Sequence, residues 1–179
     1  MREALARLRA IALVTTLPSR GSYVTHLNEA HIREAQFLRE ALEVAQMRHL
    51  ANHGVPASFD AQITANLAAQ ADVVRNHDTA AFHQLDDAFH IGLADATGFR
   101  RAAVVLAQEK AQLDRLRILS LHDTSHLGAL YDQHRAIYAA VKAADAERAV
   151  AATQLHLQSV LSVLHALAVD HADYFDHAV

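Results

Sequence analysis

Four side chains that can bind a metal ion fall on predicted helices, at positions that face the protein interior. Asp86 and His90 are four residues apart in the stretch LDDAFHIGLADATG, so a helix projects both from one face. His134 and His156 lie in two later apolar stretches. One carboxylate and three imidazoles suit zinc and related divalent ions. The four residues therefore predict a divalent metal site, with zinc as the first choice and nickel or manganese as alternatives.

Apolar neighbours indicate that each candidate ligand points inward. A buried carboxylate must be paired, hydrogen-bonded or bound to a metal, and helical bundles build metal sites from side chains that facing helices send into the core. With octahedral coordination, four protein ligands leave two positions for water or a small carboxylate, so the site would be a sensor or a catalyst. The apolar neighbours are Leu85, Phe89 and Leu93 on the first helix, Leu127, Leu130, Tyr131, Ile137, Tyr138 and Val141 on the second, and Val160, Val163 and Leu167 on the third.

Each of these residues also has a plainer explanation. A core histidine is more often hydrogen-bonded than bound to a metal, and an aspartate one turn earlier can simply orient it. For any one residue this explanation is favoured, whereas for the four together the two explanations are about equal. Competing positions are His83 on the face of His90, Asp87 if the register shifts, His49 with His53 at a helix end, and His122 with His126 at a helix boundary where Asp123 to Ser125 resemble capping residues.

The elements that must position these side chains are predicted to be helices. Only five Gly and two Pro interrupt the 179 residues, which are otherwise rich in strong helix formers. The predicted fold is all-α, an antiparallel bundle of about six helices joined by short connections. The helices run from about 29 to 53 after the cap Asn28, from a cap at Ser58 through Val74, from a cap at Asp78 to Gly98, from about 99 to 121, from Leu127 through Val141, and from a cap at Asp145 through Leu167. The inward stripe of the first is predicted as Ile32, Ala35, Leu38, Leu42, Ala45 and Leu50.

The first 25 residues differ from the bundle. A short helix, MREALARLRA, precedes two β-branched runs around a Pro-Ser-Arg-Gly turn, which predicts a helix followed by a β-hairpin. Four arginines against one glutamate give this segment a side-chain charge of +3, whereas the whole chain carries −4. The plain interpretation is a small ordered arm that packs on the bundle or on a partner.

Composition narrows the class of protein. A hydrophobic content of 52% over 179 residues is enough for one core, so disorder is not expected. The chain has no Cys, which excludes disulfides and leaves His and carboxylates as metal ligands. No apolar run is long enough for a membrane span or a signal peptide. We therefore expect a soluble, cytoplasmic protein without a membrane partner.

Three stretches carry a resemblance to a known family. LDDAFHIGLADATG, DQHRAIYAAVKAADAERAVAATQLHL and FLREALEVAQMRHLA resemble the effector-binding C-terminal (FCD) domain of FadR-type GntR transcriptional regulators, over roughly residues 29 to 170. In that family an all-helical bundle holds a divalent metal with one Asp and three His, which the resemblance places at the four candidate ligands. It also implies a small carboxylate effector beside the metal, assisted by an arginine of the first helix, here Arg39.

Other cations have equally ordinary roles. Arg39 could instead form an ion pair, and Arg115 and Arg117 could neutralise an effector or lie on a solvated face. One departure is Gly98-Phe99, where the family usually has Gly-Asn; it changes a turn contact and leaves the four ligand positions intact.

The N-terminal segment resembles the end of the recognition helix and the β-wing of the family's winged helix-turn-helix. The expected division is therefore residues 1–27 as part of that module and residues 28–179 as the effector-binding domain. Arg2 and Arg20 are the candidate DNA contacts. Groove reading depends on the start of the recognition helix and on the helix before it, so operator DNA is expected as a partner only of a chain with a complete winged helix.

The favoured function is that of a metabolite-sensing transcriptional regulator and not of an enzyme. Such a regulator is expected to be a homodimer. A helical metal-dependent hydrolase is the alternative, because open metal positions can activate water and the dipeptides His77-Asp78 and His122-Asp123 are typical of such enzymes. Each dipeptide precedes a predicted helix, where Asp is better explained as a cap. A structural helical dimer, which would bind no metal, is the third possibility.

Overall fold

The computed structural model describes residues 2–119 and 126–176, except for the side chains of residues 162 and 163. These residues form seven α-helices, one two-stranded sheet and a 3-10 turn, so the predicted all-α fold with its N-terminal hairpin is confirmed. The elements are α1 Arg2–Ala10, β1 Val14–Leu17, β2 Gly21–Val24, α2 Glu29–His53, α3 Ala57–Arg75, α4 Thr79–Ala96, α5 Arg100–Leu119, α6 Leu127–Lys142, α7 Ala146–Asp170 and η1 Ala172–Tyr174.

Three helices begin at the side-chain caps that the sequence predicts. Asn28 accepts from the His31 N–H at 3.1 Å, Asp78 from Ala81 at 3.0 Å, and Asp145 from Arg148 at 2.9 Å. The predicted cap at Ser58 is wrong. The helix begins at Ala57 after Pro56, whose φ of −57° suits a helix start and whose carbonyl accepts from Phe59 and Asp60.

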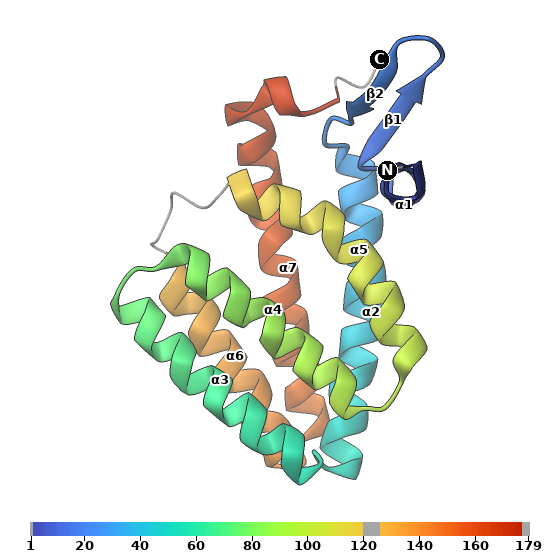
Figure 1. The fold of residues 1–179 in the computed structure, drawn as a ribbon. Helices are drawn as coiled ribbons and strands as arrows, with labels where there is room; N and C mark the ends of the chain where they lie inside the picture. Colours follow the sequence, from blue (N-terminus) through green and yellow to red (C-terminus); the bar gives the residue numbers. More distant parts are fainter. Residues whose placement is uncertain (1, 120–125, 177–179) are drawn as a thin grey trace.

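The bundle is organised around its two longest helices. In Figure 1, α2 and α7 run side by side, and α3, α4 and α6 gather at the end away from the β-hairpin. Helix α5 crosses beside α2, between these helices and the hairpin. No helix within the described part of the chain is long and apolar enough to cross a membrane.

Buried apolar residues form two clusters, one toward each end of α2. Met47, Leu50 and Phe89 belong to the cluster between α2, α3, α4, α6 and α7, and Leu113 and Leu116 of α5 belong to the other. The bundle also buries nine polar side chains among the described residues, and they are Gln36, Arg39, Glu43, Gln46, Gln70, Asp86, His134, Thr153 and His156.

The predicted inward stripe of α2 is only partly right. Ile32, Ala35 and Leu50 are buried, whereas Leu38 is 39% exposed and Ala45 is exposed. The helix is rotated so that a polar stripe, Gln36, Arg39, Glu43 and Gln46, faces the interior in their place. Two of them bind partners on other helices, since Gln36 donates to the Leu157 carbonyl of α7 and Glu43 accepts from His90 of α4.

The hairpin follows the predicted turn. Val14 pairs with Val24 and Leu17 with Gly21, and the tight connection uses φ of 58° at Ser19 and 101° at Gly21. The segment after the hairpin is pinned to the end of the chain, because the Leu27 N–H donates to the Tyr174 carbonyl at 2.7 Å.

Candidate metal centre

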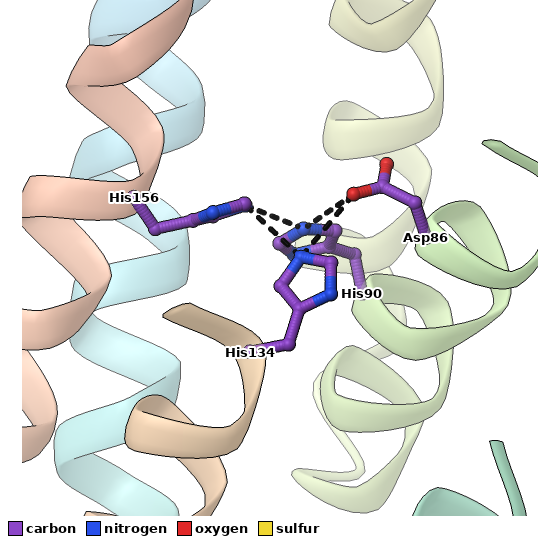
Figure 2. A group of neighbouring side chains, drawn as sticks. All are labelled: Asp86, His90, His134 and His156. Atoms are coloured by element: carbon purple, nitrogen blue, oxygen red, sulfur yellow. Dashed lines mark hydrogen bonds and ion pairs between the residues drawn. The ribbon is translucent and has the colours of Figure 1, made fainter. Parts of the chain in front are cut away.

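The four predicted ligands lie together in the middle of the bundle. His156 Nε2 is 3.1 Å from His90 Nε2 and 3.3 Å from His134 Nε2, and His134 Nε2 is 3.2 Å from Asp86 Oδ1 (Figure 2). One donor atom from each residue lies within 4.8 Å of all the others. Among the described residues this is the one group of three or more His, Asp or Glu side chains with such an arrangement.

Three helices deliver these side chains from different directions. Asp86 and His90 come from adjacent turns of α4, His134 from α6 and His156 from α7 (Figure 2). Asp86, His134 and His156 are buried, and the side chain of His90 is 13% exposed. The ring of His134 stacks on Phe89 with centroids 4.4 Å apart, so apolar packing fixes its orientation.

A chain of hydrogen bonds fixes which nitrogen of His134 carries the proton. Asn66 donates from Nδ2 to the Leu85 carbonyl at 2.9 Å, which leaves Asn66 Oδ1 to accept from Gln70 Nε2 at 2.7 Å. Gln70 Oε1 therefore faces His134 and accepts from its Nδ1–H at 2.8 Å. Because the chain begins at a backbone carbonyl, which can only accept, the neutral ring presents its Nε2 lone pair to the centre.

The other two imidazoles are oriented in the same way. His90 Nδ1–H donates a hydrogen bond to a carboxylate oxygen of Glu43 at 2.7 Å, and His156 Nδ1–H donates to Gln133 Oε1 at 2.9 Å. Burial raises the pKa of Glu43, but Arg39 and His90 outweigh burial and hold it far below its usual value, so this carboxylate is ionised. All three rings consequently turn Nε2 inward.

This arrangement fits a bound cation. Three nitrogen lone pairs and one carboxylate oxygen face one another at 3.1 to 3.8 Å. Such a group is mutually repulsive by itself and becomes favourable around a positive ion. Acceptors on the outer ring nitrogens are the usual partners of histidines that bind metals.

The electrostatic environment favours deprotonated ligands. Burial lowers the pKa of His134, and burial together with the neighbouring His134 and His90 rings lowers that of His156 well below its usual value. Burial raises the pKa of Asp86, but the charge of Arg117 is the largest of the opposing effects that hold this pKa well below the ordinary range. Neutral imidazoles and an ionised carboxylate are the forms that bind metal.

Helix α5 contributes a charge network beside the four residues. Arg117 lies 2.9 Å from Asp86 Oδ2 and 3.2 Å from Asp87, and Lys110 lies 2.9 Å from Asp87 and also contacts Asp114. Arg117 is thus neither an exposed cation nor a simple surface residue. With the imidazoles counted as neutral, three cations (Arg39, Lys110, Arg117) meet four carboxylates (Glu43, Asp86, Asp87, Asp114), a net charge of −1.

A cavity of about 190 Å³ opens next to the centre, between α4, α5 and α2. Arg39, the predicted effector contact, lines it beside His90. Its Nε pairs with Glu43 at 2.5 Å, and its two terminal nitrogens have no partner in the described part of the chain. The residues that line the cavity are Arg39, Glu43, Asp87, His90, Ile91, Ala94, Ala103, Leu106, Ala107, Lys110 and Arg117.

The competing histidine and carboxylate positions lie outside the centre. His83 is half-buried on the face of Asp86 without joining the group, and Asp87 forms ion pairs with α5. His53 donates to the His49 carbonyl at the end of α2, as expected of residues at a helix C-terminus. His122 and residues 123–125 lie outside the described residues.

The remaining predicted residues belong to the N-terminal arm and the turns. Arg2 and Arg20 are exposed on α1 and on the hairpin turn. Arg115 faces the linker after the hairpin and donates to Thr25. At Gly98-Phe99, where the family usually has Gly-Asn, Gly98 has φ 73° and the Phe99 ring contacts the His49 ring, with centroids 4.8 Å apart.

Sequence reasoning missed the residues that support the imidazoles. Glu43, Gln70 and Gln133 stand on three different helices, and nothing in their own neighbourhoods marks them. One signal was available on α2, where polar residues recur at positions 36, 39, 43 and 46 with the spacing of a single helix face.

Comparison with known proteins identifies relatives of the chain. A model of the FCD domain family matches residues 34–159. An uncharacterised HTH-type transcriptional regulator from an unstable DNA locus of Streptomyces ambofaciens is 32% identical over 98% of this chain and 73% of its own length. The HTH-type transcriptional repressor RspR of Escherichia coli K12 is 30% identical over 98% of this chain and 76% of its length.

Solved structures share the fold. Escherichia coli McbR/YncC superposes with a TM-score of 0.81 at 17% identity, over 92% of this chain and 83% of that protein. A putative GntR regulator from Rhodococcus sp. RHA1 gives a TM-score of 0.70 at 21% identity, over 92% and 79%. At these identities the likeness concerns the fold alone.

Proposed function

The chain belongs to the FCD domain family of GntR-type transcriptional regulators, and we propose that it senses a small carboxylate through a divalent metal ion bound by Asp86, His90, His134 and His156. It is a metabolite-sensing regulator and not an enzyme, because its relatives are transcriptional regulators. The convergence of three Nε2 lone pairs on one carboxylate oxygen is the observation that carries the proposed metal site. Zinc is the first choice of ion, and nickel and manganese suit the same ligands.

Charge explains why an anion would need the metal. The centre and its α5 network carry a net charge of −1, so a carboxylate meets repulsion there. A divalent ion would reverse that sign and supply a Lewis-acid cation for a carboxylate oxygen. We therefore expect the metal ion to bind first and the effector to bind only afterwards.

Arg39 is the residue that we propose holds the effector. It lines the cavity beside His90, and its hydrogen bond to a described residue is made through Nε, to Glu43. A guanidinium whose Nε is held by Glu43 is already oriented, so it can bind a carboxylate with little loss of side-chain freedom.

Helix α5 links the site to the N-terminal arm. Lys110 and Arg117 face the cavity, whereas Gln112 donates to the Ile11 carbonyl at 2.8 Å and Arg115 donates to the Thr25 hydroxyl at 3.2 Å. An effector that displaces the Asp87 contacts of Lys110 or Arg117 would shift a helix that also holds the arm. Regulation follows only if the effector binds two positions of α5 with different affinity.

The biological setting follows from the family. Operator DNA is the expected partner of a complete winged helix, and we propose a homodimer, because two-fold proteins read two-fold operators. Arg2 and Arg20 remain the proposed phosphate contacts of the arm. A regulator that binds operator DNA would act in the cytoplasm.

The hydrolase alternative has no support. Asp78 of the His77-Asp78 dipeptide accepts from the Ala81 N–H and serves as a helix cap. The His122-Asp123 dipeptide lies outside the described residues.

Calorimetry on metal-stripped protein tests the proposal. Zinc should bind at one site per chain, and acetate should bind only after zinc is added. His156→Ala should abolish both events, whereas the control His49→Ala, near the C-terminal end of α2 and outside the four-residue group, should change neither. Zinc binding that survives His156→Ala would refute the proposed ligands.

A further inference from the structure

The cavity beside the candidate metal centre is lined by charged side chains at one end and by apolar side chains at the other. Positions 87, 90, 91 and 94 of α4 and positions 103, 106, 107 and 110 of α5 each follow the spacing of one helix face. The two helices run in opposite directions after the turn at Gly98, and the Asp87–Lys110 ion pair at 2.9 Å fixes their alignment. Ala94 therefore lies at the same end as Ala103, away from the charged end.

The charged end is the one that adjoins the proposed metal site. Arg39, Glu43 and His90 stand there, together with Lys110 and Arg117 of α5. The cations at this end are paired with Glu43, Asp86 and Asp87, so a carboxylate would be held here only once the metal ion is bound, with Arg39 beside it.

The opposite end offers no hydrogen-bonding side chain among the described residues that line it. Among the described residues that line it, Ile91, Ala94, Ala103, Leu106 and Ala107, none has a polar side chain. Three of the five are alanines, which leave the space unfilled. Ile91 is 54% exposed, so a ligand that covers it would remove apolar surface from water.

The size of the cavity limits the ligand. From Asp87 to Ala94 the α4 face extends on the order of 10 Å. The volume of about 190 Å³ has room for roughly six groups of the size of a water molecule. A carboxylate head with a short tail fills such a space, whereas a long acyl chain does not.

We infer that the effector is a monocarboxylate with a short apolar tail, its head at Arg39 and its tail between Ile91, Ala103 and Leu106. This inference rests on the proposed function, because the same centre holds the head. Sugar acids and dicarboxylates are disfavoured, since a hydroxyl or second carboxylate at the apolar end would lose its water and find no partner.

Affinity for a series of acids on zinc-loaded protein tests the inference. From acetate through butyrate to hexanoate, each buried methylene should raise affinity about fourfold until the cavity is full. Glutarate and gluconate, which carry polar groups in place of the tail, should bind at least about tenfold more weakly than hexanoate.

Substitutions on α5 test whether the apolar tail of the ligand lies at the apolar end of the cavity. Ala103→Leu fills the apolar end and should weaken hexanoate at least about tenfold while leaving acetate unchanged. Val104→Leu is the matched control, because Val104 is the next residue of α5, is 59% exposed and does not line the cavity. Leu106→Gln adds a hydrogen-bonding group at the same end and should raise the affinity for glutarate relative to hexanoate.

The outcomes separate this inference from the proposed function. If glutarate or gluconate binds more tightly than hexanoate, or if Ala103→Leu and Val104→Leu behave alike, the apolar-tail assignment is wrong and carboxylate sensing stands. If zinc binds and no carboxylate of the series does, carboxylate sensing itself fails, and the tail assignment fails with it.

Discussion

Replacement of Gln70 by leucine tests the proposal that a proton position prepares the centre for metal. Gln70 is fully buried and accepts the Nδ1–H of His134 at 2.8 Å while it donates to Asn66. Leucine has nearly the same volume and no acceptor. The His134 proton would then move to Nε2, from which it can donate a hydrogen bond to the Asp86 carboxylate 3.2 Å away.

The expected loss appears in metal binding and not in metal-free stability. Loss of an orienting hydrogen bond on a ligand histidine costs about 10- to 100-fold in metal affinity, or about 1.4 to 2.7 kcal/mol. In metal-free protein, two hydrogen bonds worth about 0.5 to 1.5 kcal/mol each are lost and one charge-assisted bond to Asp86 replaces them, so unfolding should change by about 1 kcal/mol or less.

Two measurements check the mechanism. Zinc titration against a competing chelator gives the affinity, and nitrogen NMR of labelled imidazoles shows which ring nitrogen of His134 carries the proton in each variant. Gln36→Leu is the matched control, because Gln36 is equally buried but bonds only to the Leu157 carbonyl. Its zinc affinity should remain within about twofold of the parent.

Two results would refute this reasoning. One is unchanged zinc affinity in Gln70→Leu, which would mean that the proton on His134 does not limit binding. The other is a parent protein, free of metal, whose His134 proton is found on Nε2, because the hydrogen-bond chain from the Leu85 carbonyl would then not set the tautomer.

Three further predictions concern stability. His134→Ala should lower the melting temperature more in zinc than in chelator, since ion binding at 100 times Kd adds about 2.7 kcal/mol to the folded state; equal loss in both buffers would indicate a packing role. In the presence of a chelator, urea unfolding should show full stability above pH 6.5 and a decline as the pH falls below that value. The reason is that burial lowers the pKa of His134 and His156 in the folded protein, whereas the same histidines in the unfolded chain take up protons near the ordinary value of 6.5. His134 and His156 together contribute at most about 2.7 kcal/mol per pH unit to this decline, and a flat profile would contradict neutral burial of the rings. Gly98→Ala should destabilise by about 1 kcal/mol because φ is 73° there, whereas Gly128→Ala, in the first turn of α6 with open space around it, should be neutral or stabilising by denaturant titration.

Local chemistry made much of the fold predictable. Asn28, Asp78 and Asp145 begin helices because their side chains accept an N–H that the first turn leaves unpaired, and this depends on neighbours in sequence. Ser58 failed because Pro56, two residues earlier, competes for the same helix start. The hairpin followed from its turn residues and β-branched runs in the same way.

The rotation of α2 was beyond such reasoning. Leu38 and Ala45 fit an apolar stripe as well as any residue, yet the side that faces inward is decided by what stands opposite. Arg39 and Glu43 are buried because each is the other's partner and His90 completes the group. A sequence records the side chains of one helix and not the partners that another helix will offer.

For the candidate metal centre too, the sequence predicted some features and the tertiary structure decided others. Helical spacing and apolar neighbours were enough to select Asp86, His90, His134 and His156, because periodicity decides which way a side chain points. Only the tertiary structure decided that their four donor atoms lie within 4.8 Å and that Glu43, Gln70 and Gln133 hold each imidazole proton on the outer nitrogen. Those contacts join residues 23 to 64 positions apart, so they depend on how the helices pack.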